Sequence, residues 1–223
     1  MAPSESSTQV ATVVTTTTVS VMPTTTATSA PETTAAPTTV PPPVYVFPFV
    51  GATVSYGTDH HDYPAVDVFG CGAGIDARVV APTDGVVQQS RDVDLWDPAV
   101  DDPALRGGKY VSMVGNDGVR YYFAHLDSVA VAVGDAVRAG DPLGAMGQTG
   151  NARSTVCHTH FGVSWPCPAN ESAVRRGAVW PWPYLDAWRA GEQRSPTLEV
   201  LAAEQANPDA CAAAAAEPGA DAA

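Results

Sequence analysis

The sequence predicts an all-β fold of mainly small antiparallel sheets, as in a β-roll, with long loops and a short C-terminal helix. Short apolar runs rich in β-branched and aromatic residues, separated by turn residues, indicate strands between residues 52 and 89. Residues 109–114 and 119–125 flank the Asn-Asp-Gly turn of residues 116–118, a pattern typical of a β-hairpin. In residues 131–150 glycines recur every few positions, which indicates tight turns between very short strands.

The same patterns place the individual elements along the chain. Strands outside the hairpin are expected at residues 52–56, 65–69, 78–81, 86–89 and 157–164. Residues 92–103 are rich in Asp and Pro and predict a long surface loop. A short helix is expected at residues 184–190, because Gly191 follows it directly. We expect the aromatic side chains around this helix to pack it onto the sheet rather than to line a binding surface: Trp180, Trp182, Tyr184 and Trp188.

The composition divides the chain into three parts. Residues 1–43 consist mostly of Thr, Pro, Ala, Ser and Val, a composition that cannot bury a core, and they predict a disordered linker. Residues 44–201 contain the strand patterns and form one folded domain. Residues 202–223 are rich in Ala and acidic, without an apolar period, and predict a disordered tail.

The charge and the apolar runs exclude some partners. The formal net charge is −13, which argues against a nucleic acid or an anionic membrane surface as partner. No run approaches the roughly 20 apolar residues needed to cross a bilayer. No signal peptide is visible, because the first basic residue is Arg78 and threonines interrupt the early apolar runs. We expect membrane attachment only through an N-terminal signal or anchor that this sequence does not contain.

Four cysteines are present, and none of them forms a Cys-x-x-Cys pair. A thiolate zinc site or a thioredoxin-type site is therefore not expected. The even number fits disulfide bonds in an exported protein, with three pairings open. A bridge between two of Cys71, Cys157 and Cys167 would brace the histidine-bearing strand at residues 157–164.

That strand carries two histidines two residues apart. Successive side chains of a strand point to opposite faces, so His158 and His160 share one face and Thr159 points away. Two imidazoles on one face can form half of a zinc site.

One carboxylate and three further histidines can complete such a site. Asp67 is a single acid in an apolar strand, which is costly unless it is paired, hydrogen-bonded or bound to a metal. His60 and His61 lie in the polar loop before it, and His125 ends the second strand of the hairpin. Zinc catalysis uses three protein ligands and an open position, and the remaining histidines can move protons and stabilise an oxyanion.

Several motifs occur in a recognisable order. They are a histidine followed by Asp67-Val68, then VAPTDGVV at residues 80–87, YFAHL at 122–126, VGDAV at 133–137, GDPLG at 140–144, GQTG at 147–150 and HTHF at 158–161. This order resembles the lysostaphin/LytM-type zinc metallopeptidases, most of which cut peptide crosslinks in bacterial peptidoglycan. The resemblance covers roughly residues 50–165 and makes residues 44–201 a LytM-like metallopeptidase domain.

The resemblance also implies roles for the site residues. Zn²⁺ would be the cofactor, held by an upstream histidine, Asp67 and His160. His125 and His158 would be the catalytic pair that acts on the attacking water and the tetrahedral intermediate. Tyr56 would correspond to a tyrosine that stabilises the transition state in some members.

The chain departs from the family pattern at two places. The usual first motif, His-x-x-x-Asp, would put a ligand at the position of Tyr63, whereas the histidines here precede Asp67 by six and seven residues. Strand parity favours His61 as the ligand, but Pro64 makes the parity uncertain and leaves His60 open. The second departure is Thr159, which stands where the family often has Leu and faces away from the metal.

These observations lead to a function hypothesis with an alternative. The first is a zinc-dependent metalloendopeptidase, extracellular or in the cell envelope, that hydrolyses peptide crosslinks of peptidoglycan. The alternative is a non-catalytic LytM-domain regulator that activates other cell-wall hydrolases, and the complete ligand set favours the enzyme. A lipoyl or biotinyl carrier domain is excluded, because the sole lysine, Lys109, lies at a strand start and not at a hairpin tip.

Overall fold

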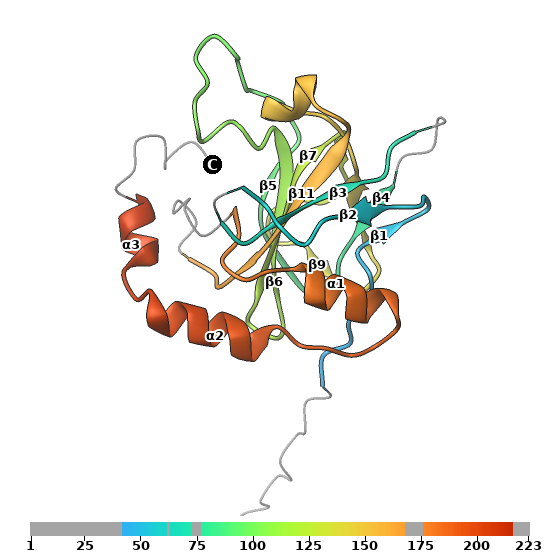
Figure 1. Cartoon of the computed structure of the whole chain (residues 1–223), viewed down its shortest axis with the longest axis vertical. Helices are drawn as coiled ribbons and strands as arrows, with labels where there is room; N and C mark the ends of the chain where they lie inside the picture. The colour runs from blue at the N-terminus through green and yellow to red at the C-terminus, as the bar shows by residue number, and fades with distance from the viewer. Residues whose placement is uncertain (1–41, 62, 73–76, 168–175, 216–223) are drawn as a thin grey trace, which may run out of the picture. The chain divides into compact units, whose positions relative to one another are not determined.

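The computed structural model describes residues 42–61, 63–72, 77–167 and 176–215, which contain two β-sheets (Figure 1). The larger sheet has seven strands in the order β2-β3-β11-β7-β6-β5-β9, and the smaller has four in the order β1-β4-β10-β8. Within each sheet, all paired strands are antiparallel, which confirms the predicted all-β fold. Residues 1–41 of the predicted linker lie outside the described residues.

The element bounds are as follows. The strands of the larger sheet are β2 (Ser55–Tyr56), β3 (Val66–Phe69), β5 (Gly85–Arg91), β6 (Lys109–Gly115), β7 (Arg120–Leu126), β9 (Ala136–Val137) and β11 (His158–Ser164). The smaller sheet contains β1 (Phe49–Val50), β4 (Arg78–Val80), β8 (Ser128–Val129) and β10 (Pro142–Ala145). The helices are the 3₁₀ helix η1 (Gly150–Ser154) and the α-helices α1 (Trp182–Arg189), α2 (Thr197–Ala206) and α3 (Ala210–Ala215).

Strand β11 is central to the larger sheet, between β3 and β7. All seven of its residues are buried. On its core face Phe161 stacks on Phe123 with ring centroids 4.9 Å apart, and Phe49 of the smaller sheet packs edge-on against Phe161 at 6.0 Å. Because aromatic packing of this kind fixes the strands on one face, the opposite face of β11 can hold polar side chains in defined positions.

The predicted hairpin and surface loop are both present. Strands β6 and β7 pair through a turn in which Gly118 has a φ of +78°, a conformation that favours glycine. The Asp117 carboxylate accepts hydrogen bonds from the hydroxyl groups of Tyr121 at 2.6 Å and Tyr45 at 2.9 Å. The loop after β5 spans residues 92–108 without a strand or helix.

The predicted helix is α1, which begins two residues earlier than expected. Pro183 lies in the first helical turn, where its missing N–H leaves no hydrogen bond unmade. Trp188 is buried and stacks on Tyr45 with ring centroids 5.4 Å apart. As predicted, this end of the chain packs onto the β structure.

The expectation of a disordered tail from residue 202 is wrong for the residues up to 215. Helix α2 continues through Ala206, and α3 follows it. Val200 of α2 is buried, the Tyr184 hydroxyl donates a hydrogen bond to Glu199, and Cys211 of α3 forms a disulfide with Cys167. The alanine-rich sequence has high helix propensity. These tertiary contacts stabilise the helices against the domain, although their sequence lacks an apolar period. In the part of the chain that is described, no helix is long and apolar enough to span a bilayer.

Candidate metal centre

The centre forms around Asp67, where β3 and β11 run side by side. The register pairs Asp67 with His160, so that both side chains lie on the same face of the sheet. Nδ1 of His160 is 3.2 Å from Oδ1 of Asp67. His158, two residues earlier on the same strand, has its Nε2 4.0 Å from the same oxygen. The alternation of strand side chains places the two histidines together, as predicted.

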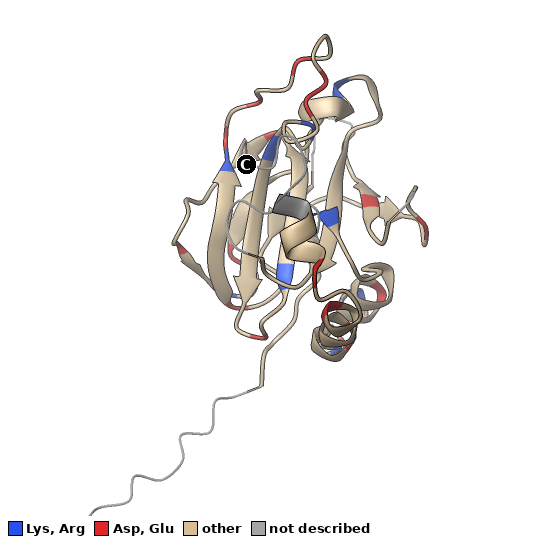
Figure 2. Cartoon of the chain, turned by 90° about the vertical axis from the view of Figure 1, so that its left-hand side faces the viewer, with Lys and Arg blue, Asp and Glu red and all other residues tan. Residues whose placement is uncertain are grey.

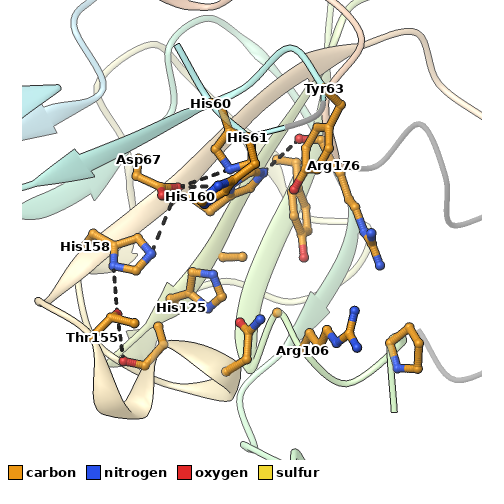
Figure 3. A pocket seen from close by; sticks show the side chains of 16 residues that line it. His60, His61, Tyr63, Asp67, Arg106, His125, Thr155, His158, His160 and Arg176 are labelled. Atoms are coloured by element: carbon orange, nitrogen blue, oxygen red, sulfur yellow. Dashed lines mark hydrogen bonds and ion pairs between the residues drawn. The ribbon is translucent and has the colours of Figure 1, made fainter. Parts of the chain in front are cut away.

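His60 brings a third imidazole to this carboxylate from the loop before β3. Its Nε2 is 3.8 Å from Oδ1 of Asp67, and its ring centroid is 4.9 Å from that of His160. His61 is exposed, although donor atoms of His60, His61 and Asp67 lie within 4.8 Å of one another (Figure 3). Strand parity does not apply here, because residues 57–61 and 63–65 form no strand.

His125 reaches the same region from the end of β7. It has a φ of +62°, which is uncommon and strained for a residue other than glycine. Its backbone N–H donates to the Gly107 carbonyl at 2.9 Å, and its Nδ1 is 2.9 Å from the Thr149 carbonyl. The ring centroid lies 5.0 Å from that of His158. Two loops therefore hold His125 in its strained conformation.

Glycines allow those two loops to approach each other. A Cβ on Gly108 would lie 2.3 Å from the backbone nitrogen of Gly150, and one on Gly150 would lie 2.1 Å from the Arg106 carbonyl oxygen. Both glycines also have positive φ angles, of +62° and +66°. The close packing brings the loop of residues 92–108 against η1, beside His125.

Backbone carbonyls fix the tautomers of three histidines. The Arg176 carbonyl lies 2.8 Å from Nε2 of His160, and the Val156 carbonyl lies 2.7 Å from Nδ1 of His158. A carbonyl only accepts, so these nitrogens and Nδ1 of His125 each carry a proton. Nδ1 of His160 and Nε2 of His158 are then the nitrogens that face the Asp67 carboxylate. With a proton, Nδ1 of His160 donates a hydrogen bond to Asp67, and without one it offers a lone pair to a metal. A cation between such groups removes the repulsion of their lone pairs, and an imidazole–carbonyl hydrogen bond is the usual support for a metal-binding histidine.

The ionisation of these groups also suits a metal. Burial of Asp67 acts to raise the pKa of its carboxyl, but the hydrogen bond with His160 and the neighbouring imidazoles outweigh it and lower the pKa to about 2. Burial, followed by repulsion from His160, lowers the pKa of His60. Burial also lowers the pKa of His125 to about 3, with the charges of His160 and His158 adding to the effect. At neutral pH Asp67 is ionised and these two imidazoles are neutral, which are the forms that bind metals and accept protons.

The centre lines a cavity of about 350 Å³ (Figure 3). Besides the five histidines and Asp67, its walls contain Tyr63, Pro103, Arg106, Gly107, Tyr122, Ala124, Asn151, Ala152, Thr155 and Arg176. The predicted surface loop thus forms one wall of the cavity, and η1 forms another. No pattern in the sequence indicated Arg106 or Arg176, because their neighbours in space come from distant segments.

Tyr56 is not among the residues that line the cavity. Its hydroxyl donates a hydrogen bond to Asp186 of α1 at 2.7 Å, so it holds the helix against the sheet. Tyr63 lines the cavity instead, with its ring centroid 4.6 Å from that of His60 and 5.8 Å from that of His160. The expectation for Tyr56 is therefore corrected.

A disulfide braces the centre from one side. Cys71 follows β3 and Cys157 precedes β11, and the two are bonded with their Cα atoms 5.8 Å apart. This confirms that two of the three cysteines near the histidine-bearing strand form a bridge. The bond holds together the two strands that carry Asp67 and His160.

Comparisons with known proteins indicate the family to which this part of the chain belongs. Residues 66–175 match the model of peptidase family M23. The glycyl-glycine endopeptidase ALE-1 of Staphylococcus capitis is 46% identical over 56 residues, which are 25% of this chain and 15% of that protein. Lysostaphin of Staphylococcus simulans is 45% identical over 56 residues, 25% of this chain and 11% of that protein. The chain thus spans a small part of the length of these curated relatives.

The fold is also similar to a solved structure. The LytM crystal structure from Ruminococcus gnavus superposes with a TM-score of 0.51 at 24% identity, over 68% of this chain and 63% of that chain. His60 and His61 precede the matched residues, whereas Asp67, His125, His158 and His160 lie within them. The match to the family model, the local identity to lysostaphin and ALE-1 and the shared LytM fold identify residues 66–175 as a peptidase family M23 domain.

Proposed function

We propose that this protein is a zinc-dependent metalloendopeptidase that hydrolyses peptide bonds of bacterial peptidoglycan. The observation that carries the proposal is the approach of three imidazole nitrogens to one oxygen of Asp67, at distances of 3.2, 3.8 and 4.0 Å, on the wall of a cavity. Membership of a peptidase family supports it, and so does the similarity to two staphylococcal proteins, one of which is named a glycyl-glycine endopeptidase.

We assign Nε2 of His60, Oδ1 of Asp67 and Nδ1 of His160 as the zinc ligands. Two imidazoles and one carboxylate are a donor set typical of catalytic zinc. His60 is preferred to His61 because its side chain is buried beside Asp67, whereas His61 is exposed. When bound, zinc would polarise the substrate carbonyl and lower the pKa of water at the open position.

His158 and His125 are assigned the proton transfers. Nε2 of His158 carries a lone pair near Asp67, so it can accept the proton of the attacking water and later pass it to the leaving amine. His125 is buried and neutral beside it. Because its proton is on Nδ1, its Nε2 offers a lone pair that can accept a hydrogen bond or a proton from the attacking water.

The location and partners follow from the substrate. Peptidoglycan crosslinks lie outside the cell membrane, so the protein would act extracellularly or in the cell envelope. Two disulfides in the described part of the chain fit an oxidising compartment. The net charge of −13 gives no support for a nucleic-acid partner.

The proposal is tested by metal content and turnover measured on the same samples. The full chain, His160→Ala, His158→Ala and the exposed control Arg138→Gln are loaded with zinc, desalted and assayed for release of soluble fragments from purified peptidoglycan. We expect His160→Ala to lose zinc and activity, and His158→Ala to keep zinc but lose activity at least 100-fold. Arg138→Gln should match the wild type. Zinc binding without turnover would instead indicate the non-catalytic regulator, and no zinc binding would contradict the ligand assignment.

A further inference from the structure

Two arginines line the same cavity as the histidines. The sequence has only 11 basic residues against 24 acidic ones, yet Arg106 and Arg176 both lie on this wall. Figure 3 shows both guanidinium groups at one end of the cavity, with His125 and His158 toward the other. Figure 2 shows that acidic positions dominate the neighbouring loop of residues 92–103. A pair of cations here is therefore a local exception to the charge of the molecule.

The position of Arg176 is fixed by its backbone. Its carbonyl accepts a hydrogen bond from Nε2 of His160 at 2.8 Å. A Cβ on Gly162 of β11 would lie 2.2 Å from that carbonyl oxygen, and one on Gly177 would lie 2.2 Å from the Pro64 carbonyl. Because of these close approaches, the backbone of Arg176 and Gly177 lies tightly packed between β11 and the loop before β3. The side chain takes no part in these contacts.

Arg106 and Arg176 differ in their partners. The Arg106 guanidinium forms two hydrogen bonds with Asp101, at 2.9 Å from Nε and 2.6 Å from Nη2, which orient it from the loop. Within residues 42–61, 63–72, 77–167 and 176–215, no carboxylate forms an ion pair with Arg176. Asp101 already offsets much of the charge of Arg106, so the charge of Arg176 is the one that an incoming anion would chiefly neutralise. Guanidinium groups bind carboxylates with two parallel hydrogen bonds, which gives both affinity and orientation.

We propose that Arg176 and Arg106 form a carboxylate-binding subsite, so that the favoured substrate is a peptide with a free carboxylate close to the cleaved amide. Both arginines line the same cavity of about 350 Å³ as the histidines and Asp67. The carboxylate therefore belongs to a residue close to the scissile bond. The statement about the substrate rests on the proposed function. The subsite would favour an anionic peptide over an uncharged glycine bridge.

Binding of matched peptides tests the subsite without relying on turnover. The probes are fluorophore-labelled, C-terminally amidated Ala/Gly pentapeptides in which one residue is Glu or Gln, with each position scanned in turn. Binding to the full chain is measured by fluorescence anisotropy at low and high salt. For at least one position we expect the Glu peptide to bind at least 10-fold more tightly than its Gln counterpart, with the difference shrinking in high salt.

The variants connect this preference to the two arginines. Arg176→Gln should reduce the Glu/Gln ratio to less than twofold, Arg176→Lys should retain part of it, and Arg138→Gln should leave it unchanged. Arg106→Gln should reduce the ratio by a smaller factor, because Asp101 shares its charge. Zinc content, measured on each variant, should not change, since the Arg176 carbonyl remains in place.

Two results would overturn the subsite: a ratio near 1 in the wild type, or the same ratio in Arg176→Gln as in the wild type. The outcome is separate from that for the peptidase. A Glu preference that depends on Arg176 in a protein without turnover would uphold the subsite and contradict the proposed activity. Turnover with no Glu preference would uphold the proposed activity and contradict the subsite.

Discussion

Asp67 lies on a strand whose neighbouring residues Val66 and Val68 are completely buried, so its carboxylate had to find polar partners on the opposite face. The partners on β11 could be predicted, because strand alternation determines which residues share a face. The choice between His60 and His61 could not be predicted in this way, since the segment that carries them is a loop with no regular period. The positions of Arg106 and Arg176 depend on tertiary contacts that no local pattern indicates.

The first prediction concerns the choice between His60 and His61. His60→Ala should weaken zinc binding at least 100-fold, because it removes a buried imidazole 3.8 Å from Asp67. His61→Ala should weaken it by less than 10-fold, since this side chain is exposed. Competition with a chromophoric zinc chelator measures both affinities. The reverse order would assign the ligand to His61 and contradict the site described above.

At the scale of elements, the strands that carry the site could be predicted, whereas the walls around it could not. The HTHF and YFAHL motifs fall on β11 and β7, where alternation and the hairpin turn define the pairing. Residues 92–103 of the loop after β5 were predicted as a long surface loop. It becomes a wall because Asp94 accepts hydrogen bonds from the Gly150 backbone at 3.0 Å and from Arg153 at 2.9 Å, which fasten it to η1.

This fastening predicts a pH-dependent stability. Burial acts to raise the pKa of Asp94, but the hydrogen bonds from Gly150, Arg153 and Trp96 outweigh it and lower the pKa below its usual value. The unfolded state then binds the proton more tightly, so the stabilisation is complete above the unfolded pKa of about 3.9 and is lost as the pH falls below it. Asp94→Asn should therefore lower the free energy of unfolding by about 1–2 kcal/mol at pH 7, and by less at pH 3.

Urea unfolding of the wild type and Asp94→Asn at both pH values measures this difference. The exposed Asp92 of the same loop provides the control variant Asp92→Asn, whose stability should follow that of the wild type at each pH. An equal loss of stability at pH 7 and pH 3 would show that the Asp94 charge does not fasten the loop.

At the scale of the whole molecule, the antiparallel sheets, helix α1 and a disulfide near the site were predictable, but helices α2 and α3 were not. The amphipathic signal was missing from residues 197–215, and these helices are placed by the packing of Val200, the hydrogen bond from Tyr184 to Glu199 and the bond between Cys167 and Cys211. The two disulfides thus have different tasks. Cys71–Cys157 joins the strands of the candidate metal centre, and Cys167–Cys211 attaches α3.

We expect removal of the two disulfides to have different effects on stability and on zinc affinity. Changing both Cys71 and Cys157 to Ala opens a crosslink across 86 residues and should cost about 2–5 kcal/mol of stability, together with a measurable loss of zinc affinity. Changing both Cys167 and Cys211 to Ala should lower stability without changing zinc affinity. Chemical unfolding and zinc competition on the two double variants test this. Equal zinc affinity in both would show that the first disulfide does not position the centre.

The most direct test of the central claim is a zinc titration of the chelator-treated protein while peptide-bond hydrolysis in purified peptidoglycan is followed. We predict that activity is absent at the start, rises in proportion to added zinc and reaches its plateau at one zinc per chain. Activity that survives complete removal of zinc would contradict the account. So would stoichiometric zinc binding that restores no hydrolysis, because His60, Asp67 and His160 would then hold a metal without serving a peptidase.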